Sequence, residues 1–328
     1  MIRVSRRLLI WLGFMLSLAG CATVPSMVPP PEPERRIALS FDDTPRAAGL
    51  FLSQEERARR LIAALDEAGV AQAAFFVNPG RIADAPHGET HITAYAAAGH
   101  VIANHTANHI SLTQNEVAEY IADIDAAEAW LAGRDGYRPW FRYPYLNEGR
   151  RDAARRDAIR NALRERGLVN GYVTVDGSDW FYEDNLRAAH AAGHAIDMGA
   201  LRDLFIESHV EAASFFDDLA VRTLGRSPVH MLLLHEADLT TLFLPELVAA
   251  LRRDGWTIVT ADEAYADPMA QQATTYDTPS AQGTLTEMLA WQAGLPAPRW
   301  YARNDLTEAR RVFDARVLGV DPQEEEAP

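Results

Sequence analysis

Two adjacent aspartates and two histidines four positions apart are the residues of this chain best suited to chemistry. Asp42 and Asp43 end the first apolar run, and His105 and His109 follow a later one. One carboxylate and two imidazoles can hold a divalent metal ion and leave positions open for water and substrate. The second carboxylate can then serve as a base. We expect the spacing of four to place both imidazoles on one side of a helical turn.

Three further polar motifs occur downstream, and each also ends an apolar run. Alone, each signal is weak, because an Asp-Asp pair is more often a solvated turn and an Arg near a Pro is common. Five motifs in order at strand ends indicate one site, since barrel-type α/β folds build their sites from the loops at the carboxyl ends of strands. A distant histidine acid would complete a site for metal-assisted amide or ester hydrolysis. The three later motifs are Phe141-Arg142-Tyr143-Pro144-Tyr145, Asp176-Gly177-Ser178-Asp179-Trp180 and Leu232-Leu233-Leu234-His235.

Short apolar runs alternate with amphipathic stretches along the chain, which predicts an α/β fold with a parallel sheet. Helix ends are expected at Gly69, Gly99, Gly167 and Gly255. Capping boxes are expected at 53–56 and 113–116. The predicted strands are 37–41, 72–77, 101–103, 140–143, 172–175, 229–234 and 256–259. The predicted helices are 57–68, 117–131, 153–166, 212–224 and 244–253.

The five motifs together resemble those of the polysaccharide deacetylases of carbohydrate esterase family four, the NodB-homology domain. That family is marked by T/S-F-D-D, H-S/T-x-x-H, R-x-P-Y, D-x-x-D-W/Y and L-x-H motifs, and all five are present. The resemblance covers about 35–266 and implies a distorted (β/α) barrel. We divide the chain accordingly into a deacetylase domain at 35–270 and a partly helical C-terminal extension at 271–328, with helices over 285–293 and 306–318. The segment 181–207 reads as an insert that forms a lid or groove wall.

The resemblance also implies a role for each matching residue. Asp43, His105 and His109 would bind one divalent metal ion, usually zinc, with other divalent ions as alternatives. Asp42 would be the general base for the attacking water, and His235 the acid that protonates the leaving amine. The supporting residues would be Arg142, which holds the base, Asp179, which supports the charge of the acid, Tyr145, whose backbone N–H stabilises the oxyanion, and Trp180 and Leu233, which wall the pocket for the acetyl methyl group.

The activity implied is removal of acetyl groups from N-acetylhexosamine residues of a cell-envelope or environmental polysaccharide. Two alternatives stay open. One is an O-acetyl esterase or a small-molecule amidohydrolase on the same fold. The other is a catalytically silent carbohydrate-binding protein, although the intact metal-binding and catalytic residues argue against it.

The N-terminus predicts where the protein works. Segment 1–20 has a basic start and an apolar stretch too short to span a bilayer with ease, and it leads into Leu18-Ala19-Gly20-Cys21. This pattern indicates a bacterial lipoprotein signal peptide with Cys21 as the lipidated residue, and an ordinary secretory peptide is the alternative. The proline-rich segment 21–34 would be a flexible tether. We expect an exported protein anchored on the periplasmic side, and Ala22 favours the outer membrane.

The charge of the chain limits its partners. The formal net charge is −15, and removing the three arginines of segment 1–20 takes it to −18. Such a surface repels nucleic acid and anionic lipid headgroups. Membrane association would therefore come from the lipid anchor alone, and the expected partner is an acetylated glycan.

Overall fold

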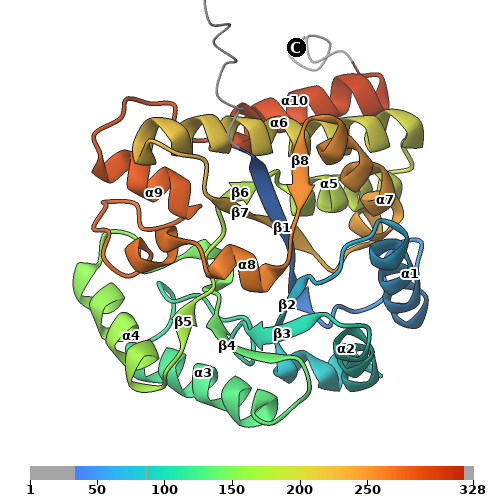
Figure 1. Cartoon of the computed structure of the whole chain (residues 1–328). Helices are drawn as coiled ribbons and strands as arrows, with labels where there is room; N and C mark the ends of the chain where they lie inside the picture. The colour runs from blue at the N-terminus through green and yellow to red at the C-terminus, as the bar shows by residue number, and fades with distance from the viewer. Residues whose placement is uncertain (1–33, 86, 321–328) are drawn as a thin grey trace, which may run out of the picture. The chain divides into compact units, whose positions relative to one another are not determined.

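A parallel sheet curled into part of a barrel forms the centre of the molecule (Figure 1). The structure is a computed structural model and describes residues 34–85 and 87–320. Cys21, the signal segment 1–20 and the tether up to residue 33 lie outside these residues. The sheet has the order β5-β4-β3-β2-β1-β7-β6, and β8 also pairs with β1. The strands are β1 Arg35–Thr44, β2 Ala74–Val77, β3 Val101–Asn104, β4 Tyr137–Phe141, β5 Val169–Asn170, β6 Val175–Asp176, β7 Val229–His235 and β8 Trp256–Ile258.

The central strand β1 sets the register that aligns the strand ends. It pairs with β7 along most of its length, up to Asp42 opposite His235. On its other side, its first half pairs with β8 and its second half with β2. The last residues of β2, β3 and β4 are register partners, namely Val77, Asn104 and Phe141. The residues that follow these strands therefore emerge at one level.

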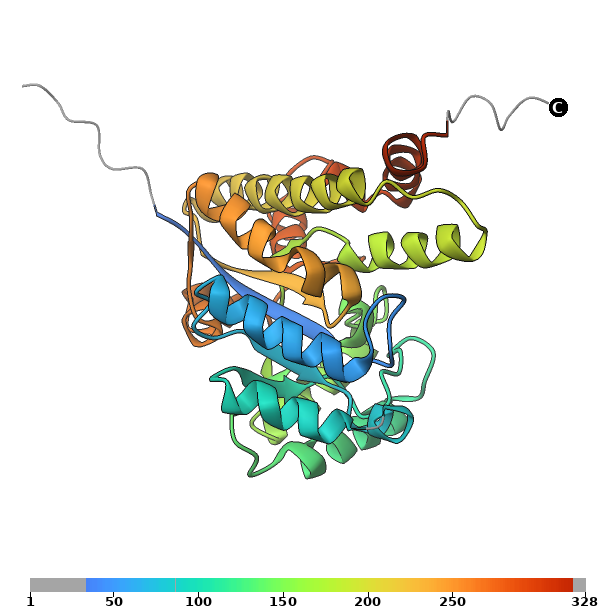
Figure 2. The same ribbon diagram turned by 90° about the vertical axis from the view of Figure 1, so that its right-hand side faces the viewer.

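Helices surround the sheet, as expected for a distorted (β/α) barrel, which confirms the predicted fold class. In Figure 2 the helices α6, α7, α1 and α2 follow one another along one flank. No helix among the described residues combines the length and hydropathy that a membrane crossing needs. The α-helices are α1 Gln54–Glu67, α2 Gly88–Ala97, α3 Val117–Leu131, α4 Ala153–Glu165, α5 Asp179–Ala191, α6 Met198–Leu224, α7 Asp238–Arg253, α8 Ala261–Tyr265, α9 Leu285–Gln292 and α10 Leu306–Phe313.

The predicted helix ends agree with the structure at most places. The four glycines expected to stop helices all adopt left-handed backbone angles, with φ between 63° and 95°. Ser53 caps α1 by accepting a hydrogen bond from the N–H of Glu56 at 3.1 Å. The capping box expected at 113–116 is wrong, because α3 begins later and is capped by Glu116 together with Glu119. The strand expected at 172–175 is also mostly wrong, since only Val175 belongs to a strand there.

The C-terminal extension packs into the core of the barrel and is partly helical, as expected. Leu285 and Met288 of α9 belong to the same buried cluster as Met231 of β7. Tyr301 and Phe313 belong to the larger cluster that the surrounding helices form with the sheet. The extension is therefore a structural part of the barrel wall.

Candidate functional site

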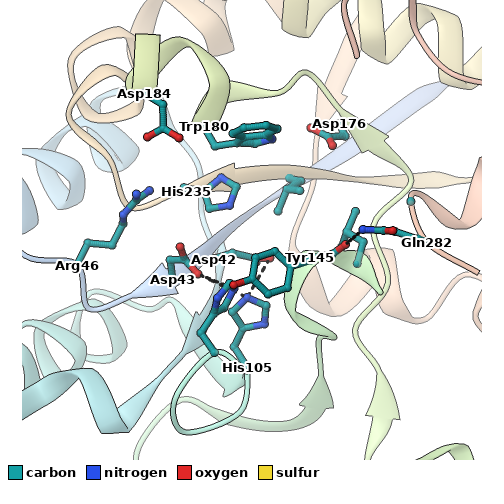
Figure 3. Close-up of a pocket in the computed structure, with 14 residues that line it drawn as sticks. Asp42, Asp43, Arg46, His105, Tyr145, Asp176, Trp180, Asp184, His235 and Gln282 are labelled. Atoms are coloured by element: carbon teal, nitrogen blue, oxygen red, sulfur yellow. Dashed lines mark hydrogen bonds and ion pairs between the residues drawn. The ribbon is translucent and has the colours of Figure 1, made fainter. Parts of the chain in front are cut away.

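A cavity of about 530 Å³ opens at the carboxyl ends of the strands (Figure 3). All five motifs contribute to its lining, as the register of the sheet requires. The motif residues that line it are Asp42, Asp43, His105, His109, Tyr145, Asp176, Trp180, Leu233 and His235. These residues lie up to 193 positions apart in the sequence, from Asp42 to His235.

The expected metal ligands form a group that fits a metal ion. One ligand atom from each of Asp43, His105 and His109 lies within 4.8 Å of the others. Oδ1 of Asp43 is 3.0 Å from Nε2 of His109, and it is a buried oxygen without a hydrogen-bond partner among the described residues. Two imidazoles and a carboxylate with room beside them are a donor set typical of catalytic zinc.

The protonation states of both histidines also suit metal binding. Nδ1 of His105 donates a hydrogen bond to the backbone carbonyl of Arg142 at 2.9 Å, which leaves the Nε2 lone pair free. Burial lowers the pKa of His105 well below its ordinary value, and burial also lowers the pKa of His109 to about 4. Both rings are therefore neutral near pH 7, as metal ligation requires.

The two histidines lie on a loop, so the expectation of a helical turn is wrong. His105 follows β3 directly, and no helix begins between His105 and Val117, where α3 starts. Thr106 and His109 have left-handed backbone angles, with φ of 62° and 55°. The side chain of Asn104 holds this bend by accepting a hydrogen bond from the N–H of Thr106 at 2.7 Å. The bend, and not helical spacing, brings the two ring centroids within 4.9 Å.

Asp42 faces the interior of the barrel and is held by a buried arginine. Nη1 of Arg142 donates to Oδ1 of Asp42 at 2.7 Å and to Oγ of Ser40 at 2.9 Å. Nη2 of Arg142 donates to the hydroxyl of Tyr265 at 2.7 Å, so the guanidinium is fixed on both sides. Burial raises the pKa of Asp42 to about 6, although the Arg142 charge opposes the rise. A carboxylate with such a pKa suits general-base work near neutrality.

His235, the register partner of Asp42 on β7, forms a buried pair with Asp179. Oδ1 of Asp179 is 2.7 Å from Nδ1 of His235, and its Oδ2 accepts the backbone N–H of His235 at 2.7 Å. Burial alone would lower the pKa of His235, but the Asp179 charge outweighs it and raises the pKa to about 9. The hydroxyl of Thr240 also donates to Asp179 at 2.9 Å. His235 is therefore an imidazolium at neutral pH and can act as an acid.

The other expected site residues border the same cavity. Tyr145 has a left-handed backbone with φ 59° and ψ 18°, and its exposed ring lies 4.6 Å from that of His109. Trp180 in the first turn of α5 and Leu233 of β7 line the cavity. In the view of Figure 3, Trp180 and Tyr145 lie on opposite sides of it. An apolar group can thus enter between aromatic and aliphatic walls.

Five lining residues lie outside the predicted motifs, namely Leu146, Gly283 and the polar Arg46, Asp184 and Gln282. Arg46 is the first cationic residue after Asp43, and its closeness to this motif in the sequence could have marked it as a residue of the site. Asp184 lies in the first turns of α5, so the start of the 181–207 insert does form part of the cavity wall. Gln282 comes from the extension, and its Nε2 donates to the backbone carbonyl of Tyr145 at 3.1 Å. Nothing in the local sequence marks Gln282 as part of a site.

The comparison with protein families finds one match. Residues 30–170 match the model of the family described as polysaccharide deacetylase. This segment contains the first three motifs, up to Tyr145. A search of curated protein sequences finds no match.

Several solved structures share the fold. A family 4 carbohydrate esterase from Streptomyces lividans, solved with acetate, is 22% identical, with 70% of this chain and 95% of that chain covered and a TM-score of 0.47. The chitin deacetylase of Colletotrichum lindemuthianum is 21% identical, with 72% and 89% covered and a TM-score of 0.50. The peptidoglycan deacetylase PdaC of Bacillus subtilis is 19% identical, with 70% and 90% covered and a TM-score of 0.45.

Proposed function

We propose that this chain removes acetyl groups from N-acetylhexosamine residues of a cell-envelope or environmental polysaccharide, because residues 30–170 match the polysaccharide deacetylase family. One observation carries the proposal. A buried carboxylate with a pKa of about 6, Asp42, and a histidine with a pKa of about 9, His235, flank one three-residue metal site in one cavity. A base and an acid with pKa values on opposite sides of neutrality are what amide hydrolysis needs.

In this proposal, the metal site would activate the acetyl carbonyl group for attack. A divalent ion held by Asp43, His105 and His109 would act as a Lewis acid toward the acetyl carbonyl and a water molecule. Zinc is the ion that we propose, because two imidazoles and one carboxylate with open positions form a catalytic zinc set. The carbonyl of Arg142 orients His105 through its Nδ1 proton.

Two residues on the neighbouring strands β1 and β7, Asp42 and His235, would carry out the proton transfers. Asp42 accepts a proton from the attacking water, and Arg142 keeps its carboxylate aimed into the cavity. His235 donates a proton to the nitrogen of the leaving amine, and Asp179 keeps the imidazolium charged until then. Because Asp42 and His235 are register partners on β1 and β7, the sheet itself fixes their separation.

Two further groups would bind the acetyl group. The backbone N–H of Tyr145 would donate a hydrogen bond to the oxyanion that develops on the carbonyl oxygen. Trp180 and Leu233 would contact the methyl group. These contacts position the acetyl carbon between the base and the acid.

The charge of His235 favours cleavage of an amide over an ester. An amine leaves only after its nitrogen is protonated, whereas an alkoxide depends less on an acid. The test is an acetate-release assay of the full chain in detergent, on matched N-acetylated and O-acetylated oligosaccharides, with the Asp43→Ala variant as control. We expect acetate from the N-acetylated glycans in the wild type only. Release from O-acetylated glycans alone would favour the esterase, and no release from either would favour the silent binding protein.

A further inference from the structure

The turn from β6 to α5 leads directly into two residues of the site. The turn consists of Gly177 and Ser178, and α5 begins with Asp179 and Trp180. Figure 3 shows Trp180 and the last residue of β6, Asp176, along the same side of the cavity. A small shift of this turn would therefore move the carboxylate of Asp179 relative to the acid and would move a wall of the cavity.

This turn has an unusual shape for the start of a helix. Ser178 precedes α5 with a left-handed backbone, at φ 56° and ψ 45°, and its hydroxyl does not cap the helix. Residues at this position are usually extended, and a left-handed backbone is unfavourable for a serine. Gly177 lies against α6, where a β-carbon would come within 2.6 Å of the ring of His209. Contacts from elsewhere in the chain are therefore needed to hold the turn.

Asn304 of the C-terminal extension makes such contacts. Its Nδ2 donates to the backbone carbonyl of Asp176 at 3.0 Å, and its Oδ1 accepts from the hydroxyl of Ser178 at 3.0 Å. A reversed amide would place its oxygen against the carbonyl of Asp176, so both contacts select one orientation. Ser178 is buried, at 3% exposure, so water replaces its hydrogen bond poorly. Two hydrogen bonds of this kind are comparable in net strength to the penalty of one left-handed residue.

The segment around Asn304 is fixed on α6. The N–H of Asn304 donates to the carbonyl of Tyr301 at 2.9 Å, and the hydroxyl of Tyr301 donates to Oε2 of Glu211 at 2.7 Å. Nη1 of Arg303 donates to the hydroxyl of Ser208 at 3.1 Å. Glu211 and Ser208 both belong to α6. Asn304 therefore holds the turn from a rigid support.

We propose that Asn304 is a positioning residue for the acid: it keeps Ser178 in its left-handed shape and thereby keeps the carboxylate of Asp179 against His235. This inference rests on the proposed function, in which His235 protonates the leaving amine. Asp179 contacts His235 at its ring and at its backbone N–H, both at 2.7 Å. Both contacts depend on where α5 begins, because Asp179 directly follows Ser178.

The test removes the contacts of Asn304 and then relieves the turn. Asn304→Ala loses both hydrogen bonds. Ser178→Ala and Ser178→Gly lose the same hydroxyl, which binds only Asn304 among the described residues, but only glycine adopts the left-handed backbone without a penalty. The two Ser178 variants are thus matched to each other. Asn161→Ala is the surface control, because Asn161 is exposed on α4 and accepts only from Arg164 in the same helix, at 2.9 Å.

Two measurements report on the acid. The pH profile of acetate release by the zinc-loaded full chain gives the falling limb. Histidine-selective NMR titration gives the protonation of the His235 ring without turnover, with His235→Ala to assign its signal. The other charges that act on this ring are Asp43, which raises its pKa, and Arg46, which lowers it, and both stay in every variant. Thermal unfolding and metal content show whether each variant is intact. A role in stability alone would lower the unfolding temperature and leave both pH measurements unchanged.

We expect Asn304→Ala to lower the titration midpoint of His235 and the falling limb by about one pH unit, because a displaced Asp179 opposes the effect of burial less. It should also lower kcat about tenfold. Ser178→Ala should shift the midpoint in the same direction by less, whereas Ser178→Gly should stay close to the wild type. Ser178→Gly combined with Asn304→Ala should recover most of the loss, since the relieved turn no longer has to be held. Asn161→Ala should change nothing.

An unchanged midpoint in a folded Asn304→Ala variant would overturn the inference. Equal midpoints in Ser178→Ala and Ser178→Gly would overturn it as well, and this pair decides the matter if Asn304→Ala does not fold. A wild type that releases no acetate from any glycan would instead refute the proposed function, while the NMR titration would still show whether Asn304 holds Asp179 against His235.

Discussion

Asp42 and Asp43 are neighbours in the chain, but their side chains meet different partners. Asp42 ends the extended part of β1 and points into the barrel, where it meets Arg142. Asp43 has a left-handed backbone with φ 68°, which turns its carboxylate toward His109. The left-handed conformation of Asp43 thus directs two adjacent carboxylates to different positions, one suited to a base and the other to a metal ligand.

This difference leads to a prediction about the two aspartates. Asp43→Ala should lose metal and activity together, because it removes one of three protein ligands. Asp42→Asn should keep the metal and lose about a hundred- to ten-thousand-fold in rate, because only the base is removed. Metal analysis and acetate release measure both effects, with Asp66→Asn on α1 as a surface control. If Asp42→Asn empties the metal site while Asp43→Ala does not, the two roles are reversed.

His235 leads to a prediction about pH. The acid must carry its proton, so the rate should fall as the pH rises through the His235 pKa of about 9. In Asp179→Asn the charge that raises this pKa is gone, and burial, which lowers it, remains. The falling limb should then move to lower pH, toward or below the ordinary histidine pKa of about 6.5, and the rate at neutrality should drop. An alkaline limb that stays in place in Asp179→Asn, and persists in His235→Ala, would show that another group is the acid.

The loops after the strands are the elements that complete the site. Left-handed backbone angles occur in three of them, at Thr106, His109, Tyr145 and Ser178, and also at Asp43 near the end of β1, with φ between 55° and 68°. Such angles are unfavourable for residues other than glycine, and they are found preferentially at functional sites. These loops therefore hold shapes that the surrounding contacts impose.

The sequence could predict the strand ends but not the shapes of these loops. The apolar runs in the sequence predict the strands β1, β3, β4 and β7. The polar motifs at the ends of these strands predict which residues meet in the cavity. The reversal at His109 could not be predicted, because it depends on contacts such as that between Asn104 and Thr106. Gln282 was missed for the same reason, since its contact with Tyr145 joins residues 137 positions apart.

That contact leads to a prediction about the extension. Gln282 donates to the carbonyl of Tyr145 and accepts from Nε of Arg150 at 2.7 Å, so it is held in place itself. Gln282→Ala should loosen the Tyr145 backbone and lower kcat about tenfold, since small displacements of catalytic groups are costly. KM and metal content should change little. Gln271→Ala, an exposed position in the same segment, is the control, and an unchanged kcat in Gln282→Ala would show that Tyr145 needs no such support.

At the scale of the whole chain, we propose that the protein is a lipoprotein anchored through Cys21, on the periplasmic side of the outer membrane. The proposal rests on Leu18-Ala19-Gly20-Cys21. Cys21→Ser should abolish acylation and partitioning into detergent, while the rate on soluble oligosaccharides stays unchanged. Mass spectrometry of the mature N-terminus and detergent phase separation measure these outcomes. A native mature protein without lipid would refute the anchor.

The C-terminal extension contributes buried side chains to the core of the barrel. Residues 34–320 belong to one compact unit, and the extension places Tyr276, Leu285, Met288, Tyr301 and Phe313 in the core, each at most 5% exposed. Full burial of one such side chain stabilises a protein by roughly 1.5–3 kcal/mol. Together these five would contribute roughly 7.5–15 kcal/mol, which is comparable to the net stability of about 5–15 kcal/mol of typical domains.

A chain that ends at residue 270 should therefore fail to fold cooperatively. Removing the extension uncovers the apolar side chains of α6 and of the barrel interior, and it also removes Asn304, whose side chain binds the carbonyl of Asp176 at 3.0 Å. The matched control ends at residue 320 and keeps every described residue of the extension. Thermal unfolding, size exclusion and metal content should match the full chain in the control and should be lost in the shorter one. A soluble 1–270 chain with a sharp unfolding transition would show that the barrel is stable without its extension.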